Sequence, residues 1–142
     1  MNILACGALA NELIALKRLN HWQSMTITCL PAHYHQTPWK IPAAVAAAIE
    51  KIRRQNDEDI LVAYGDCGTG GQLDKVLDEA GVARLPGAHC YQFFAGHEVF
   101  SALHEAEVGT FYLTDFLVDH FQTYVWRALG LERKPELLEM YF

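Results

Sequence analysis

The stretch DILVAYGDCGTGGQLDKVLDEAG, residues 59–81, predicts a buried β-strand that leads through a glycine-rich loop into a helix. Asp59–Tyr64 is a compact apolar run, as expected for a strand covered on both faces of a parallel sheet. The helix is predicted over Gln72–Glu79, and Gly81 ends it, because glycine readily adopts the left-handed conformation that follows a helix. A strand, loop and helix in this order form the repeating unit of α/β proteins.

The same order recurs on both sides of this stretch. Apolar or β-branched runs predict strands, and apolar residues at helical spacing predict helices. The predicted strands are Met1–Cys6, Met25–Leu30, a weaker Val82–Leu85 and Gly109–Leu113. The predicted helices are Ala10–Leu19, Ile41–Gln55, Cys90–Phe94 continuing through His104, Asp115–Leu129 behind a Thr114 N-cap, and Pro135–Phe142. We therefore expect a single α/β domain over residues 1–142: an open, mostly parallel sheet of four to five strands flanked by helices, three-layer and flavodoxin-like or Rossmann-like.

Composition narrows the classes of protein to consider. Hydrophobic residues make up 51% of the 142 residues, which is enough to bury a core and argues against a disordered chain. The formal net charge is −6 and the longest basic cluster is Arg53-Arg54, so nucleic acid is not an expected partner. No apolar run approaches the ~20 residues that cross a bilayer, and no secretory leader precedes Cys6, so we expect a cytoplasmic protein without a membrane partner.

The cysteines divide according to their places on the predicted strands. Cys29 lies within a strand and alternates with Ile27, which predicts a core thiol. The other candidates follow strand ends: Cys6 the first strand, His35 the second, Cys67 the third and Cys90 the fourth. Open parallel sheets carry their functional loops beyond the carboxyl ends of the strands. We therefore expect these four side chains to converge on one edge of the sheet.

Three thiols and one imidazole are typical ligands of zinc, and thiolates also bind iron. The sequence thus predicts a metal site of Cys6, His35, Cys67 and Cys90, with Tyr64, Gly65, Gly68 and Gly70 shaping the pocket. If only three of them bind the ion, the open position makes the site catalytic; if all four bind, it is structural. Two other classes stay open: a metal-free thiol enzyme with Cys67 as nucleophile and His35 or His89 as base, and a small-ligand module with inert cysteines.

Five motifs resemble the domain-of-unknown-function family 1638. They are Cys6-Gly7, the His-x-x-Pro segment His35–Pro38, the loop Tyr64-Gly65-Asp66-Cys67-Gly68, Cys90, and Gly109–Leu113. The chain departs from the family at Pro86–His89, where members carry Arg-x-x-Asp before the cysteine.

The resemblance also carries an expectation about function, because members are often met beside corrinoid-dependent methyltransferase systems. It implies a methyl-transfer role, with a corrinoid as a second cofactor and such a system, or a small molecule, as partner. A zinc-held thiolate that accepts a methyl group would suit that role. Aromatic residues near the C-terminus, Trp126, Tyr141 and Phe142, further predict a homodimer.

Overall fold

The computed structural model describes residues 1–56, 58–107 and 109–141. The chain forms two compact units, Met1–Thr110 and Phe111–Phe142. All the predicted site residues belong to the first unit. One domain over residues 1–142 stays a prediction.

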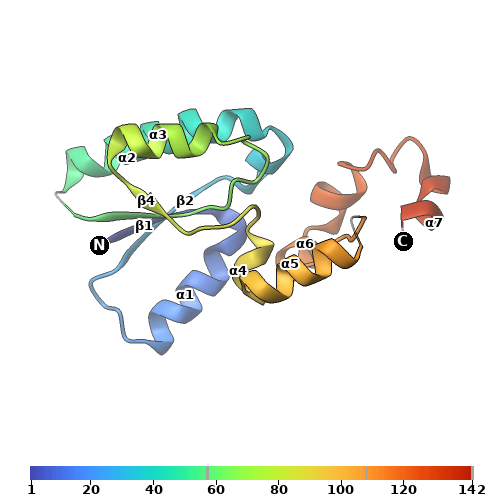
Figure 1. Cartoon of the computed structure of the whole chain (residues 1–142), viewed down its shortest axis with the longest axis horizontal. Helices are drawn as coiled ribbons and strands as arrows, with labels where there is room; N and C mark the ends of the chain where they lie inside the picture. The colour runs from blue at the N-terminus through green and yellow to red at the C-terminus, as the bar shows by residue number, and fades with distance from the viewer. Residues whose placement is uncertain (57, 108, 142) are drawn as a thin grey trace. The chain divides into compact units, whose positions relative to one another are not determined.

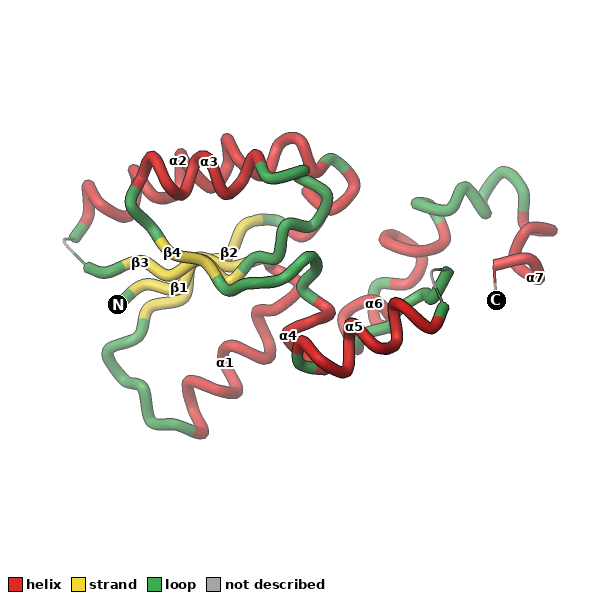
Figure 2. The backbone as a smooth tube through the Cα atoms, viewed as in Figure 1, coloured by secondary structure: helices red, strands yellow, loops and turns green. Residues whose placement is uncertain are grey.

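Four parallel strands form the sheet of the first unit (Figure 2). They are β1 (Asn2–Cys6), β2 (Thr26–Leu30), β3 (Ile60–Ala63) and β4 (Ala83–Arg84), in the order β2-β1-β3-β4. Ala5 of β1 pairs with Cys29 on one side and with Ala63 on the other. The predicted open parallel sheet is therefore confirmed, with four strands.

Helices cover both faces of this sheet, which gives three layers (Figure 1). Helices α2 (Ile41–Gln55) and α3 (Gln72–Ala80) lie on one face, and α1 (Ala10–Leu19) lies on the other. Two short helices, α4 (Tyr91–Ala95) and α5 (His97–Ala106), follow β4. Three single turns of 3-10 helix join these elements: η1 (Gly7–Leu9), η2 (Ala32–Gln36) and η3 (Pro38–Lys40).

The spacing of apolar residues explains how the layers pack. In α2, Ile41, Val45, Ile49 and Ile52 recur every three or four residues and are all buried, so one face of this helix faces the core. All five residues of β1 are buried, as expected for an inner strand with helices on both faces of the sheet. On the face covered by α1, a second cluster joins Ile3, Ala5, Met25 and Ala63.

The strand order of the sheet reverses between β1 and β3. From β1 the chain passes outward to β2 and then returns across β1 to reach β3. The loops that follow β1 and β3 therefore leave neighbouring strands in the direction where α/β proteins bind ligands. Cys6 is the last residue of β1, and the loop after β3 carries Cys67.

The second unit differs from the sequence expectations at two places. Residues 110–114 form no strand, although Gly109–Leu113 was predicted as one, because β-forming residues become a strand only where a ladder partner is in place. The long helix predicted over Asp115–Leu129 is broken into α6 (Asp115–Asp119) and a π-helical turn, η4 (Gln122–Trp126). In that turn the amide of Arg127 donates to the carbonyl of Gln122, five residues back, at 3.2 Å. Apolar spacing does not distinguish such a widened turn from an α-helical one.

Two features of the second unit are confirmed. The Thr114 hydroxyl caps α6 by accepting a hydrogen bond from the Leu117 amide at 3.4 Å. The predicted helical tail is present as a 3-10 turn, η5 (Pro135–Leu137), and α7 (Leu138–Tyr141), while Phe142 lies outside the described residues. Over the described part of the chain, every helix is too short or too polar to span a bilayer.

Candidate metal centre

The loop after β3 holds Cys67 in an uncommon backbone conformation. Its φ is 49°, in the left-handed region that side chains other than glycine seldom adopt and that costs about 1–3 kcal/mol. Asp66 fixes the loop: its carboxylate accepts hydrogen bonds from the Thr69 hydroxyl at 2.6 Å and from the amides of Gly70 and Gly71 at 3.1 and 2.9 Å. Burial would raise the pKa of Asp66, but these hydrogen bonds outweigh it and lower that pKa. The strained backbone of Cys67 is thus held by its neighbours.

A second loop, between β4 and α4, lies directly against the first. The amides of Asp66 and Cys67 donate to the carbonyls of Gly87 and Ala88 at 2.9 and 2.8 Å. The approach is closest at Gly65, where an added Cβ would lie 2.7 Å from the backbone carbonyl carbon of His89. Only glycine allows this contact, and the contact brings Cys90, the next residue after His89, towards Cys67.

Two polar side chains hold this second loop in place. Arg84 of β4 donates to the carbonyls of Leu85 and Gly87 at 2.9 and 3.2 Å and forms a two-point ion pair with Asp74 of α3. The buried Gln92 accepts a hydrogen bond from the Ala88 amide at 3.2 Å. These contacts fix the loop backbone just before Cys90.

The two loops bring two thiols and one imidazole together. The sulfur atoms of Cys67 and Cys90 are 3.3 Å apart, and each residue is 7% exposed. His35, in η2 after β2, offers a ring nitrogen, so that one ligand atom from each of His35, Cys67 and Cys90 lies within 4.8 Å of the others. The His35 residue as a whole is exposed, whereas Cys67 and Cys90 are buried.

Cys6 lies beside this group, next to the imidazole of His35. Its sulfur is 3.6 Å from Nδ1 of His35 and accepts a hydrogen bond from the Ala8 amide at 3.4 Å. Tyr64 is close by, because Ala5 pairs with Ala63 and the next residues of the two strands leave the sheet side by side. Tyr64 is 1% exposed, and burial, followed by the charge of Cys6 and a hydrogen bond with Cys6, raises the pKa of its hydroxyl.

The electrostatics of the metal-free protein favour one thiolate. A hydrogen bond from Cys90, opposed by burial and aided by His35 and His89, lowers the pKa of Cys67 to about 3. The same hydrogen bond, followed by burial, raises the pKa of Cys90, which keeps it a thiol. Burial would lower the pKa of His35, but hydrogen bonds to Cys6 and Cys67 raise it to about 10. Because thiolates are the form that binds metals, Cys67 is ready to act as a ligand.

The donor set and its spacing fit a zinc ion. With Zn–S bonds of about 2.3 Å, two thiolates on a tetrahedral ion lie about 3.8 Å apart. The observed 3.3 Å between Cys67 and Cys90 requires their sulfur atoms to separate by only a few tenths of an ångström. Two cysteines and one histidine are a known ligand set of catalytic zinc sites, in which the fourth position is open.

The sequence-predicted residues are therefore brought to one edge of the sheet, as expected, with different roles. His35, Cys67 and Cys90 form the group that could hold a metal, and Cys6 contacts His35. Gly65 is required by the contact with His89, and Gly68, at φ +84°, faces Pro38. Gly70 also has a positive φ, +61°, and an added Cβ there would meet nothing within 4 Å, so it serves the turn.

Three positioning residues were not found from the sequence: Asp66, Arg84 and Gln92. Asp66 had a local signal, since an Asp followed by Thr and glycines is typical of side chains that hydrogen-bond the next backbone amides. Arg84 had none, because its partners belong to a different helix and to a loop of irregular backbone.

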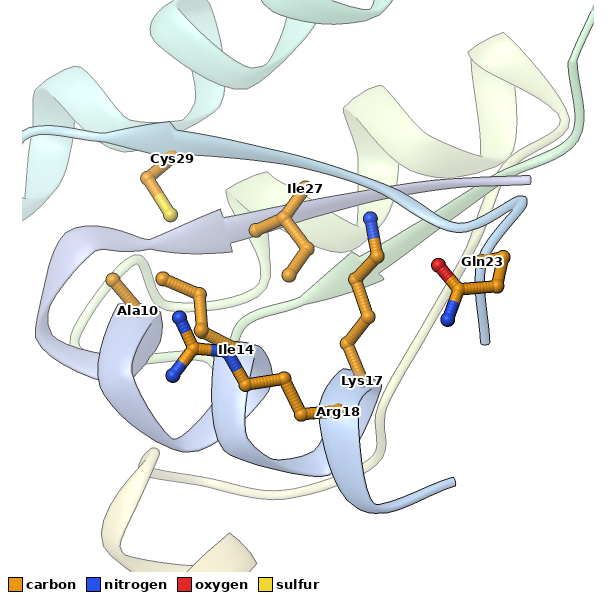
Figure 3. Close-up of a pocket in the computed structure, with 7 residues that line it drawn as sticks. All are labelled: Ala10, Ile14, Lys17, Arg18, Gln23, Ile27 and Cys29. Carbon is orange, nitrogen blue, oxygen red and sulfur yellow. The ribbon is translucent and has the colours of Figure 1, made fainter. Parts of the chain in front are cut away.

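Cys29 is not the core residue that the sequence predicted. It is exposed, because β2 is an edge strand with a neighbour on one side only. Figure 3 shows Cys29 and Ile27 pointing together into a surface hollow against α1, which is also lined by Ile14, Lys17 and Arg18. Partial burial of the thiol, and then the charge of Cys6, raise the pKa of Cys29. Cys29 thus faces α1 and takes no part in the group of His35, Cys67 and Cys90.

Fold and site together define a parallel α/β protein with a His/Cys/Cys group where the strand order reverses. The chain belongs to the family described as Protein of unknown function (DUF1638), whose model matches residues 29–142. The match begins at Cys29 and so includes His35, Cys67 and Cys90 but not Cys6. Comparisons with the curated proteins and with the solved structures found no match.

Proposed function

We propose that this protein binds one zinc ion through His35, Cys67 and Cys90. The observation that carries the proposal is the convergence of these three ligand atoms to within 4.8 Å of one another from three separate loops. A strained cysteine and a glycine that allows two backbones to touch are features a packed core does not need. They are explained if the two loops exist to bring the sulfur atoms together.

Zinc is favoured over iron by the small number and the types of ligand. Zinc is readily held by two thiolates and one imidazole in a tetrahedral site, whereas mononuclear iron–sulfur sites are typically made of thiolates alone. Iron is the alternative metal, and elemental analysis of the purified protein distinguishes it from zinc.

A three-ligand zinc site supports chemistry at its fourth position. Zinc activates a bound water or holds a bound thiolate as a nucleophile, and it contributes charge stabilisation without redox change. A methyl-transfer role in a corrinoid system is the specific activity that the family resemblance suggests. A spectrophotometric titration with cobalamin tests it: a change in the cobalamin spectrum supports a corrinoid role, and an unchanged spectrum counts against one.

The metal proposal is tested by elemental analysis of protein purified without chelator. We expect about one equivalent of zinc per chain in the wild type and a large loss in both Cys67→Ser and Cys90→Ser. Cys29→Ser is the matched control, because Cys29 faces α1, and it should keep the wild-type content. Wild-type protein without bound metal would overturn the proposal, and one equivalent of iron would correct the identity of the ion.

A metal-free thiol enzyme is the second candidate, favoured by the environment of Cys67. Its pKa is lowered to about 3, and both His35 and His89 contribute to that shift, as would suit a thiolate nucleophile paired with a protonated imidazole. Alkylation distinguishes the two functions. Metal-held thiols should be protected together until a chelator is added, whereas a lone nucleophile should react at once and at the same rate with or without chelator.

A further inference from the structure

We infer that Cys67 and Cys90, the thiol pair, form a site of reversible oxidation: a small peroxide joins their sulfur atoms in a disulfide, and this oxidation releases the zinc ion. The regulation rests on the proposed function, since it acts on the metal that these two residues hold. All four cysteines of the chain are free thiols in the structure, so the thiol pair is in its reduced state.

The two sulfur atoms of the thiol pair are already in direct contact. The distance between Cys67 Sγ and Cys90 Sγ is 3.3 Å, whereas the sulfur atoms of a disulfide lie about 2.05 Å apart. Formation of the disulfide therefore requires the sulfur atoms to approach by about 1.3 Å. Binding of zinc requires them to separate, since two thiolates on a tetrahedral ion lie about 3.8 Å apart. Small opposite movements of the same two side chains thus lead to the metal-bound state or to the disulfide.

The backbone of the two loops holds the thiol pair together. The amide of Cys67 donates to the carbonyl of Ala88 at 2.8 Å, and the amide of Asp66 donates to the carbonyl of Gly87 at 2.9 Å. Neither hydrogen bond involves a sulfur atom, so the pairing of the loops does not depend on a bound metal. Two groups held in contact react with each other far faster than with groups on a second molecule. We therefore expect the disulfide to form within one chain.

The other two cysteines have different surroundings. Cys6 Sγ is 3.6 Å from Nδ1 of His35 and accepts a hydrogen bond from the Ala8 amide at 3.4 Å. Cys6 also stands outside the group of ligand atoms that lie within 4.8 Å of one another. Cys29 points into the hollow against α1 (Figure 3). Oxidation is therefore expected to select the thiol pair and to leave Cys6 and Cys29 reduced.

The chemistry balances with hydrogen peroxide as the oxidant. One sulfur attacks a peroxide oxygen and breaks the O–O bond, which gives a sulfenic acid; the second sulfur then displaces the hydroxyl and forms the S–S bond. Each sulfur atom loses one electron. The peroxide takes up both electrons and two protons, from the thiols or, when zinc holds them as thiolates, from the solvent, and leaves as two molecules of water. Thiol reductants reverse the reaction by thiol–disulfide exchange.

Joining the sulfur atoms removes both of them from the metal. Thiolates are the form of cysteine that binds a metal, and the sulfur atoms of a disulfide carry no charge. His35 alone of the three proposed ligands would remain, which is fewer than a protein zinc site needs. Zinc and the oxidant therefore compete for the same two sulfur atoms. Because both residues of the thiol pair are only 7% exposed, a small oxidant such as a peroxide suits the site.

Treatment of the zinc-loaded wild type with hydrogen peroxide tests the regulation. Released zinc is measured with a colorimetric chelator after the peroxide has been removed, and disulfides are located by mass spectrometry of unreduced peptides. We expect zinc release at least about tenfold above that of untreated protein, together with a peptide pair that joins Cys67 to Cys90. Reduction with dithiothreitol should restore zinc binding. Cys29→Ser is the matched control and should give the same release and the same peptide pair, because Cys29 faces α1.

Metal-free wild type, prepared with a chelator that is then removed, should form the same disulfide at least as fast, because no ion competes for the sulfur atoms. The possible failures are distinguishable. If untreated wild type holds no zinc, the proposed function itself fails. If it holds zinc and peroxide leaves the zinc bound, or releases it without joining Cys67 to Cys90, the metal site stands and the redox regulation is overturned. A disulfide that joins Cys67 or Cys90 to Cys6 would equally overturn the assigned pair.

Discussion

Replacing Gly65 by alanine is expected to destabilise the fold and to weaken the metal site at the same time. An added Cβ at this position would lie 2.7, 2.8 and 2.9 Å from the carbonyl carbon, Cα and amide nitrogen of His89. Carbon atoms in contact normally lie about 3.5–4.0 Å apart, so the two loops would have to separate by nearly one ångström. The obstructing atoms are backbone atoms, which cannot rotate away as the end of a side chain can.

Two estimates of the cost agree. Overpacking of a well-packed interior typically costs about 1–3 kcal/mol. If the loops separate instead, the hydrogen bonds from Asp66 and Cys67 to Gly87 and Ala88 are lost, at about 1 kcal/mol each. We therefore expect Gly65→Ala to lower the free energy of unfolding by about 2 kcal/mol, which corresponds to roughly 8 °C in Tm for a unit of about 110 residues.

The measurement is urea unfolding of the metal-free protein together with zinc affinity from competition with a chelator. Gly109→Ala is the matched control, because an added Cβ there meets nothing within 4 Å and the backbone is not left-handed. Its stability should change by less than about 0.5 kcal/mol. Zinc affinity should fall by at least about tenfold in Gly65→Ala, since Cys90 moves with His89. Equal stability and equal zinc affinity of the two variants would refute the argument that this backbone contact builds the site.

Three further predictions concern single groups. Without metal, the alkylation rate of Cys67 should stay constant from pH 8 down to about pH 4, because its pKa is lowered to about 3; a tenfold fall per pH unit below pH 8 would show an ordinary thiol. Arg84→Ala should lower the free energy of unfolding, measured in urea, by about 2 kcal/mol, because Arg84 donates hydrogen bonds to the carbonyls of Leu85 and Gly87. Arg127→Ala is the control: it removes an exposed ion pair and should change the free energy of unfolding by less than about 0.5 kcal/mol. Asp66→Asn should lower thermal stability measurably by circular dichroism, because an amide cannot accept from Thr69, Gly70 and Gly71 as a carboxylate does; an unchanged Tm would contradict its role in the loop.

The sheet and the convergence of the site could be predicted from the sequence because both follow from strand direction. Apolar runs such as Asp59–Tyr64 mark strands, and alternation with helices makes the sheet parallel. Once the sheet is parallel, the residues that follow the strands must meet at one edge, which is why His35, Cys67 and Cys90 were expected together. This inference needs no knowledge of strand order.

Strand order and chain-distant contacts could not be predicted in the same way. Cys29 was expected in the core because it lies in a strand, but β2 became an edge strand and Cys29 is exposed. The Gly109–Leu113 segment has β-forming residues without a ladder partner, so it forms no strand. The hydrogen bonds of Arg84 join residues whose proximity depends on the completed fold.

Native mass spectrometry of protein purified without chelator tests the central claim most directly, because it counts metal ions per folded chain. The account predicts that the wild type and Cys29→Ser each carry one zinc ion, and that Cys67→Ser and Cys90→Ser carry none. A wild-type chain at its metal-free mass, or a Cys67→Ser chain that keeps the metal, would contradict the assignment of His35, Cys67 and Cys90 as the metal site.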